Sequence, residues 1–313
     1  MKSTQEFDSF YHNQLLPQLE VLEPMRKKVV RRFILPAILC VISFCVFVFF
    51  WPVGIILFIL TFFMFSRYRK AKRVYTGDFK KQVMGELIQF ISSDLTYQPL
   101  GCIQQSTFQR SRIFLSSIDR YEGDDLVSGK INHTSFMFSD LNVMRKEVYY
   151  EKGQRKERWV RVFKGIFFTA DFNKNFQGRT YVLPDRLESW LGRLGKKLQK
   201  LSRSEPLVSL ENSEFEKHFV VYGTDQIEAR YILTPSFMER IVALRKLLNK
   251  SLYFSFVDSL VCIAIPFTKN SFEPAVFSKG TRIEYLKNYF TQLQSVLGVI
   301  EELDLNTRIW TKE

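Results

Sequence analysis

The feature that most constrains this chain is a run of 33 residues without a charged side chain, from Phe33 to Phe65. One straight helix of that length would measure about 50 Å, whereas the hydrocarbon core of a bilayer is about 30 Å thick. The middle of the run reads Trp51-Pro52-Val53-Gly54, where proline removes a helical hydrogen bond and glycine permits a turn. We therefore predict a transmembrane hairpin over 33–66, with spans at about 33–49 and 53–66.

Basic residues flank this run on both sides. Five precede it and five follow it: Arg26, Lys27, Lys28, Arg31, Arg32, Arg67, Arg69, Lys70, Lys72 and Arg73. A hairpin places both clusters on one side of the membrane, as the positive-inside rule requires, and puts Trp51 at the far interface, where tryptophan is favoured. The lipid bilayer is thus the first predicted partner. Because the two spans are short, re-entry from a single leaflet stays open as an alternative to full spanning.

The net charge of +13 invites a nucleic-acid hypothesis, which the location of the charge weakens. Without the ten flanking residues the net charge falls to +3, so most of the excess is positioned for anionic headgroups. We expect no nucleic-acid partner. The four cysteines, Cys40, Cys45, Cys102 and Cys262, have no metal-ligand or redox spacing, which favours a reducing compartment.

The rest of the chain is predicted in three parts. Residues 1–32 form a cytoplasmic amphipathic segment, with a helix that begins at the capping box Ser3-Thr4-Gln5-Glu6. Residues 67–95 form a basic juxtamembrane segment and a connecting helix. Residues 96–313 form one cytoplasmic domain.

Hydrophobic periodicity predicts the elements of that domain. Alternation of apolar and polar residues indicates strands at 145–150, 158–163, 166–172, 218–222, 227–233, 252–257 and 260–265. Helical spacing indicates helices at 185–201, 236–250 and 282–303. Since no regular βαβ rhythm is present, the predicted class is α+β, with an antiparallel sheet and packed helices behind the membrane hairpin.

No complete catalytic or cofactor motif is present. The segment Asp171-Phe-Asn-Lys-Asn175 opens like a calcium loop, but Phe176 replaces the required glycine and Val182 the glutamate. The stretch Gly123-Asp-Asp-Leu-Val-Ser-Gly129-Lys130 has five residues between its glycines, one more than a phosphate-binding loop. We therefore expect no metal and no cofactor.

The densest polar cluster beside apolar strands is Thr224-Asp-Gln-Ile-Glu-Ala-Arg230. On a strand, Glu228 and Arg230 would share a face, while Asp225 would point elsewhere or cap a turn. The functional interpretation is a site for an anionic or polar ligand. The structural interpretation, which we favour, is an ion pair that anchors a strand.

Three segments together resemble a known family: Lys164 to Pro184, Phe219 to Pro235, and the closing Leu305 to Glu313. Their sequences are similar to those of a bacterial family of two-span membrane proteins called domain of unknown function 3137. The resemblance covers most of the chain, the anchor included. It implies a multi-pass protein of the bacterial cytoplasmic (inner) membrane, with both termini cytoplasmic, and supplies no activity or site residue.

From these features we expect a non-enzymatic, membrane-anchored binding or scaffold domain that recognises another membrane or cytoplasmic protein. One alternative is an enzyme with an unrecognised site, near Asp225, Glu228 and Arg230 or in the acidic stretch 119–125. A second alternative is an accessory subunit of a membrane transport or envelope complex. Convergent carboxylates in a cavity would favour the enzyme, whereas an exposed apolar patch would favour the protein partner.

Overall fold

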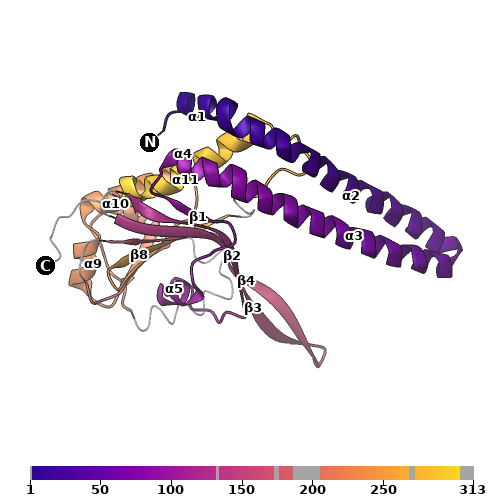
Figure 1. Ribbon diagram of the computed structural model, residues 1–313. Coiled ribbons are helices and arrows are strands. Elements are labelled where there is room, and N and C mark those ends of the chain that lie inside the picture. The colour runs from indigo at the N-terminus through magenta and orange to yellow at the C-terminus, as the bar shows by residue number, and fades with distance from the viewer. Residues whose placement is uncertain (1, 132–133, 173–175, 186–204, 268–271, 304–313) are drawn as a thin grey trace. The chain divides into compact units, whose positions relative to one another are not determined.

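The chain divides into two compact units, each drawn in the computed structural model of Figure 1. Unit 1 comprises Met1–Ser93 and Phe272–Gln292, and unit 2 comprises Asp94–Ser271 and Leu293–Glu313. The mixture of helices and antiparallel strands confirms the α+β class, and the single domain over 96–313 stays a prediction. The residues that the structure describes are 2–131, 134–172, 176–185, 205–267 and 272–303.

Unit 1 is a long helical hairpin. Its first arm runs through α1 (Thr4–Phe10), the π-helix η1 (Tyr11–Leu15) and α2 (Leu16–Phe49), and its second through α3 (Trp51–Phe79), the π-helix η2 (Lys80–Met84) and α4 (Gly85–Ile91). The predicted capping box is confirmed: the Glu6 N–H donates to Ser3 Oγ, and the Ser3 N–H donates to Glu6 Oε2. The first half of α11 (Ile283–Glu302) completes the unit.

The hairpin turns at Phe50, which leaves the helical region at φ −137° and ψ 75°. Pro52 lies in the first turn of α3, where its missing N–H needs no partner, and Trp51 begins that helix. Gly54 lies one turn further on, where an added Cβ would come within 2.4 Å of Phe47 Cα. Gly54 therefore permits the close approach of two helices, as small residues do in membrane bundles.

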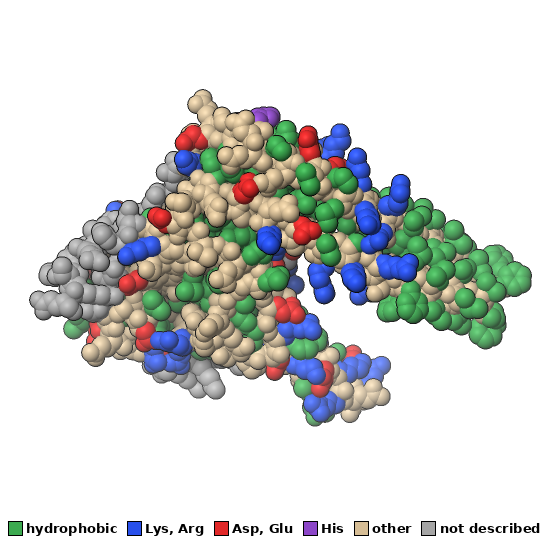
Figure 2. Space-filling model, viewed as in Figure 1, with side chains coloured by type: hydrophobic (Ala, Val, Ile, Leu, Met, Phe, Trp, Pro, Cys, Tyr) green, Lys and Arg blue, Asp and Glu red, His purple; other side chains and the backbone are tan. Residues whose placement is uncertain are grey.

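The apolar side chains of this hairpin face outward. Only 11% of the most apolar 18-residue window of each arm is buried, and Phe62 and Phe63 are both 64% exposed. Figure 2 shows hydrophobic side chains over the far end of the hairpin and a band of Lys and Arg beside them. A core helix of a soluble protein would be buried, so the two helices, long and apolar enough to cross a bilayer, suggest a membrane anchor.

The segment from Phe272 to Gln292 packs on the N-terminal helices, a contact that the sequence analysis did not anticipate. The ring of Phe7 stacks on Phe290 with centroids 4.6 Å apart. Arg26, predicted as one of the ten flanking cations, is buried: it binds the Glu23 carboxylate and donates to the carbonyl of Val276 at 2.8 Å. Its guanidinium lowers the pKa of Glu23. The other nine flanking cations are exposed or partly exposed.

Unit 2 is built on an antiparallel sheet in the order β1-β2-β3-β4-β8-β7-β5-β6. Its strands are β1 Thr96–Gln98, β2 Arg120–Ile131, β3 Thr134–Glu151, β4 Gln154–Asp171, β5 Thr180–Pro184, β6 Phe219–Gly223, β7 Tyr253–Val257 and β8 Leu260–Pro266. These confirm six of the seven predicted strands. The predicted two-residue loop between β7 and β8 is present as well, with φ near +55° at Asp258 (54°) and Ser259 (59°).

Both faces of this sheet are covered, which explains why Ile166, Phe167 and Phe168 in β4 are all fully buried. On one face, α5 (Gln105–Arg110) inserts Phe108, whose ring lies 5.0 Å from that of Phe167. The other face carries α8 (Ser213–Glu216), α9 (Gln226–Ile232) and α10 (Pro235–Leu248), where Phe237 packs against Phe256. The core thus extends on both sides of β4, β7 and β8.

Two predictions for this unit are wrong in part. Residues 227–233, predicted as a strand, form α9, because Asp225 caps the helix by accepting the N–H groups of Ile227 and Glu228. Helix α10 begins earlier than predicted, with Thr234 as its N-cap. Helix α11 confirms the prediction over 282–303, whereas the helix predicted over 185–201 lies outside the described residues.

The β3–β4 hairpin extends beyond the sheet as a two-stranded arm, visible in Figure 1. Pairing of β2 with β3 ends at Met144 and pairing of β8 with β4 ends at Gly165, so residues 145–151 and 154–160 pair with each other alone. We call these residues the arm. Its turn, at Lys152 and Gly153, has φ values of 52° and 78°.

The close helix approach at Gly54 predicts that a larger side chain there separates the two arms of the hairpin. Ser43 Oγ and Thr61 Oγ1 lie 3.5 Å apart across the same interface. A Ser43→Cys/Thr61→Cys pair, in a chain with Cys40 and Cys45 replaced by alanine, should oxidise to a disulfide in the bilayer, and adding Gly54→Leu should reduce the yield to background. Maleimide labelling of the remaining thiols measures the yield. An unchanged yield would contradict the packing role of Gly54.

Burial in β8 raises the pKa of the Cys262 thiol to about 11. Because this folded value exceeds the ordinary 9.0, the contribution to stability is complete below pH 9.0 and is lost as the pH rises through about 11. At pH 8 the folded protein should alkylate at Cys262 about 100-fold more slowly than the unfolded chain. Iodoacetamide labelling followed by mass spectrometry measures both rates, and equal rates would show that the thiol is accessible.

Candidate functional site

Unit 2 contains a cavity of about 890 Å³ at one end of the sheet. Three arginines converge on it: Arg110 and Arg112 at the end of α5, and Arg179 just before β5. The loop after β6 contributes Thr224, and the β7–β8 turn contributes Asp258. The remaining lining residues are Ser106, Gln109, Gln177 and Val257. We call this cavity the arginine pocket.

Two carboxylates accompany the three guanidinium groups. Arg110 Nη2 lies 2.6 Å from Asp258 Oδ2 in a pair whose side chains are 65% and 55% exposed. Arg112 and Arg179 share Glu205, with nitrogen–oxygen distances of 3.9 and 3.3 Å, and the Glu205 side chain is only 2% exposed. The buried Glu205 therefore orients two guanidinium groups, whereas the exposed Arg110–Asp258 ion pair contributes little stability and can open.

The backbone at Arg112 fixes the direction of its side chain. Arg112 has φ +50°, in the left-handed region that glycine usually occupies after the end of a helix. Its N–H donates to the Gln109 carbonyl, and the preceding Ser111 carbonyl accepts the Ser255 hydroxyl. A non-glycine residue held there costs of order 1–3 kcal/mol, a cost that accompanies functional positions more often than others.

The cluster predicted from sequence supports one wall of this pocket. Glu228 accepts the N–H groups of Gln177 at 3.0 Å and Gly178 at 2.6 Å, and Thr224 Oγ1 accepts the N–H of Arg179 at 2.8 Å. These hydrogen bonds fix the backbone just before β5, where Arg179 lies. Asp225 caps α9 and thereby positions Glu228.

Arg230 serves a separate contact. Its guanidinium donates to the carbonyls of Gln226 and Ser209, both at 3.2 Å. On helix α9, Glu228 and Arg230 lie two residues apart and point in different directions, and no ion pair joins them in the described structure. Whether any of the three predicted residues touches a ligand stays a prediction.

The acidic stretch 119–125 offers no convergent carboxylates. Asp119 accepts the N–H of Lys146, and the buried Asp125 accepts the hydroxyl of Tyr97 at a bulge in β2. Within the described ranges, no group of three or more His, Cys, Asp or Glu side chains is arranged to hold a metal. The arginine pocket itself escaped the sequence analysis because its cations come from segments far apart in the chain, without a local motif.

Burial acts on one further group beside the arginine pair. Tyr181, fully buried in β5, has its pKa raised by desolvation and then by the nearby Glu205 carboxylate. Tyr181 therefore stays neutral at physiological pH.

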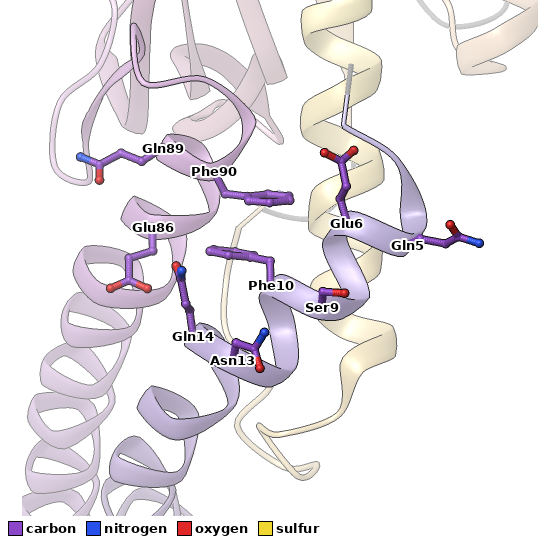
Figure 3. Close-up of a pocket in the computed structure, with 9 residues that line it drawn as sticks. All are labelled: Gln5, Glu6, Ser9, Phe10, Asn13, Gln14, Glu86, Gln89 and Phe90. Atoms are coloured by element: carbon purple, nitrogen blue, oxygen red, sulfur yellow. The ribbon is translucent and has the colours of Figure 1, made fainter.

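Unit 1 has a hollow of about 740 Å³ between its N-terminal turns and α4, shown in Figure 3. The rings of Phe10 and Phe90 stack there at 4.0 Å. Its two carboxylates are already engaged, Glu6 in the capping box and Glu86 with Gln18. The amides that remain do not specify a ligand class.

Comparison with known families finds a match in the second half of the chain. Residues 161–305 match the family described as protein of unknown function (DUF3137). This segment belongs to the DUF3137 family. The match confirms the family resemblance over residues 161–305. Within the arginine pocket, Arg179 and Asp258 lie inside the DUF3137 segment, whereas Arg110 and Arg112 lie before it.

Comparison with individual proteins adds little. The chain has no significant match among curated proteins. A crystal structure of the mycobacterial trehalose monomycolate transport factor A, TtfA, aligns with a TM-score of 0.32 and 10% identity, over 66% of this chain and 90% of that chain. Similarity at this level establishes neither a shared fold nor a shared function.

The backbone contacts of Glu228 predict a local and measurable effect. Glu228→Gln leaves one of the two N–H groups, at Gln177 or Gly178, without a carboxylate acceptor and should destabilise unit 2 by about 1–3 kcal/mol. Hydrogen exchange at these two amides should accelerate. The control is Glu211→Gln, the same change at an exposed residue. Equal effects of the two variants would contradict the positioning role of Glu228.

Proposed function

We propose that this is a two-span protein of the bacterial cytoplasmic membrane, with both termini cytoplasmic, whose sheet unit binds a small anion without catalysis. The observation that carries the binding role is the convergence of Arg110, Arg112 and Arg179 on one cavity. Guanidinium groups present paired donors that match carboxylate and phosphate oxygens. The ligand class is therefore a small carboxylate or phosphate.

The chemistry of the lining favours recognition over reaction. The described lining residues bring guanidinium, amide and hydroxyl groups, and the one carboxylate among them, Asp258, already binds Arg110. Thr224 uses its hydroxyl to hold the Arg179 backbone. An activated nucleophile needs an adjacent base, and neither hydroxyl-bearing residue of the lining, Ser106 or Thr224, has a described contact with one.

Anion titration of the full-length protein tests this role. Inorganic phosphate and succinate, added to protein in nanodiscs, should bind with heat measurable by calorimetry. Arg112→Gln and Arg179→Gln should each weaken binding by about 10- to 100-fold, the loss expected for a charged hydrogen bond. Asp258→Asn should tighten binding, because it removes the competing carboxylate from Arg110.

The matched control is Arg155→Gln, the same change on the exposed arm. If both anions fail to bind, or if Arg155→Gln weakens binding as much as Arg112→Gln, the arginine pocket is not an anion site.

The topology has its own test. A reporter fused after Lys80 should give a cytoplasmic signal, since the basic clusters on both sides of the hairpin favour that compartment. A reporter inserted at Trp51 should give an external signal if the hairpin spans, and a cytoplasmic one if it re-enters. An external signal from the Lys80 fusion would overturn the proposed topology.

A second candidate function is protein binding through the arm. One face of the arm exposes Val148, Tyr150 and Trp159, with exposures of 44%, 74% and 44%. Cations outnumber the one carboxylate beside these side chains: Arg120 lies 5.0 Å from the Trp159 ring, and Arg155, opposite Tyr150, lies 3.3 Å from Glu157. An exposed apolar face with positive charge fits a partner that presents apolar and acidic side chains.

The opposite face of the arm supplies the control for this candidate. There Arg158 binds Glu147 at 2.6 Å and Lys156 binds Glu151. After crosslinking in native membranes, a partner that binds the face with Val148, Tyr150 and Trp159 should be lost with Arg155→Glu and retained with Lys156→Glu. Equal recovery with both variants would exclude that face as the docking surface.

A further inference from the structure

We propose that a groove at the base of the apolar hairpin binds the phosphate of an anionic phospholipid. The groove encloses about 550 Å³ between α2 and α3, and its lining residues are Arg32, Leu35, Met64, Arg67 and Lys70. The inference deepens the proposed membrane anchor and rests on it. We call this site the collar groove.

Charge gives the first reason. Three cations from two helices surround one small cavity, and within the part of the chain that the structure describes none of them pairs with a carboxylate. Arg26, one helix turn and a half earlier, shows the contrast, since Glu23 neutralises it. Like charges held together repel unless an anion lies between them. A phosphate diester supplies that anion and accepts bonds from both guanidinium groups.

The position of the groove along the hairpin gives the second reason, and it distinguishes the phosphate of a lipid from a soluble phosphate. Arg32 and Arg67 directly border the uncharged run, while Leu35 and Met64 carry the groove into it. Leu35 is 52% exposed on the side where acyl chains would lie. The groove therefore offers cations to a headgroup and an apolar wall to the chain attached to it, which free phosphate cannot use.

An aromatic cluster marks the same level of the hairpin. The ring of Phe33 lies 5.2 Å from Tyr68 and 5.0 Å from Phe277, and Phe277 is 64% exposed. Aromatic side chains collect where headgroups meet hydrocarbon. From Arg32 to the turn at Trp51, the helix rises about 29 Å, close to the thickness of the hydrocarbon core. The collar groove thus lies at the level of lipid phosphates when Trp51 reaches the opposite interface.

Neighbouring cations outside the groove allow a matched experiment. Arg69 and Arg73 are exposed on α3 and do not line the groove, whereas Arg67 and Lys70 do. Arg67→Gln/Lys70→Gln and Arg69→Gln/Arg73→Gln therefore remove the same charge from the same helix. Full-length protein is placed in nanodiscs that contain phosphatidylcholine and phosphatidylglycerol. Native mass spectrometry then measures the lipids that stay bound to the protein after its release from the nanodisc.

The wild-type chain and Arg69→Gln/Arg73→Gln should retain phosphatidylglycerol, and Arg67→Gln/Lys70→Gln should retain at least about tenfold less. An equal loss in both double variants would overturn the site in favour of diffuse surface attraction. Competition by inorganic phosphate would overturn the lipid assignment in favour of a soluble anion. Normal insertion without lipid selectivity would refute the groove alone, whereas failure of the wild-type chain to insert would refute the anchor and the groove together.

Discussion

The structure depends on one constraint, the removal of an uncharged helical surface from water. Thirty-three residues without a charge fold into two helices that bury little of themselves, because their closest contact uses small side chains such as Gly54, Ser43 and Thr61. The remaining apolar surface faces outward and needs a covering that the described residues of unit 1 do not provide. In the proposed topology a bilayer supplies it, and the basic residues on both sides of the uncharged run fix its level. Arg26, which is buried in protein contacts, then lies outside the bilayer.

The sheet unit solves a different problem, which is to hold cations beside one another. Buried Glu205 pairs with both Arg112 and Arg179, and Glu228 fixes the backbone that carries Arg179. These carboxylates position the two arginines, which both line the cavity. Aromatic side chains pack on both faces of the sheet that carries these residues. The proposed anion site would therefore lose little conformational entropy on binding.

Periodicity predicted most of the fold because local pattern and burial agree along β4, β7, β8 and α11. It failed at 227–233, where five of the seven residues are apolar or aromatic and suited a strand. Asp225, with Glu228 three residues later, is the capping signal that decides for a helix. The packing of residues 272–292 on the N-terminal helices and the convergence of Arg110, Arg112 and Arg179 depend on contacts between distant segments. No local pattern encodes such contacts, so the arginine pocket became visible only in three dimensions.

The most direct test of membrane insertion is the environment of single spin labels on α3 in a reconstituted bilayer. Ile59 and Phe63 are 54% and 64% exposed, whereas Thr61 is 4% exposed at the helix contact. Labels replacing Ile59 and Phe63 should relax with dissolved oxygen but not with a water-soluble nickel complex, and a label at Thr61 should be protected from both. Strong relaxation by nickel at Ile59 and Phe63 would place this surface in water and contradict the membrane anchor.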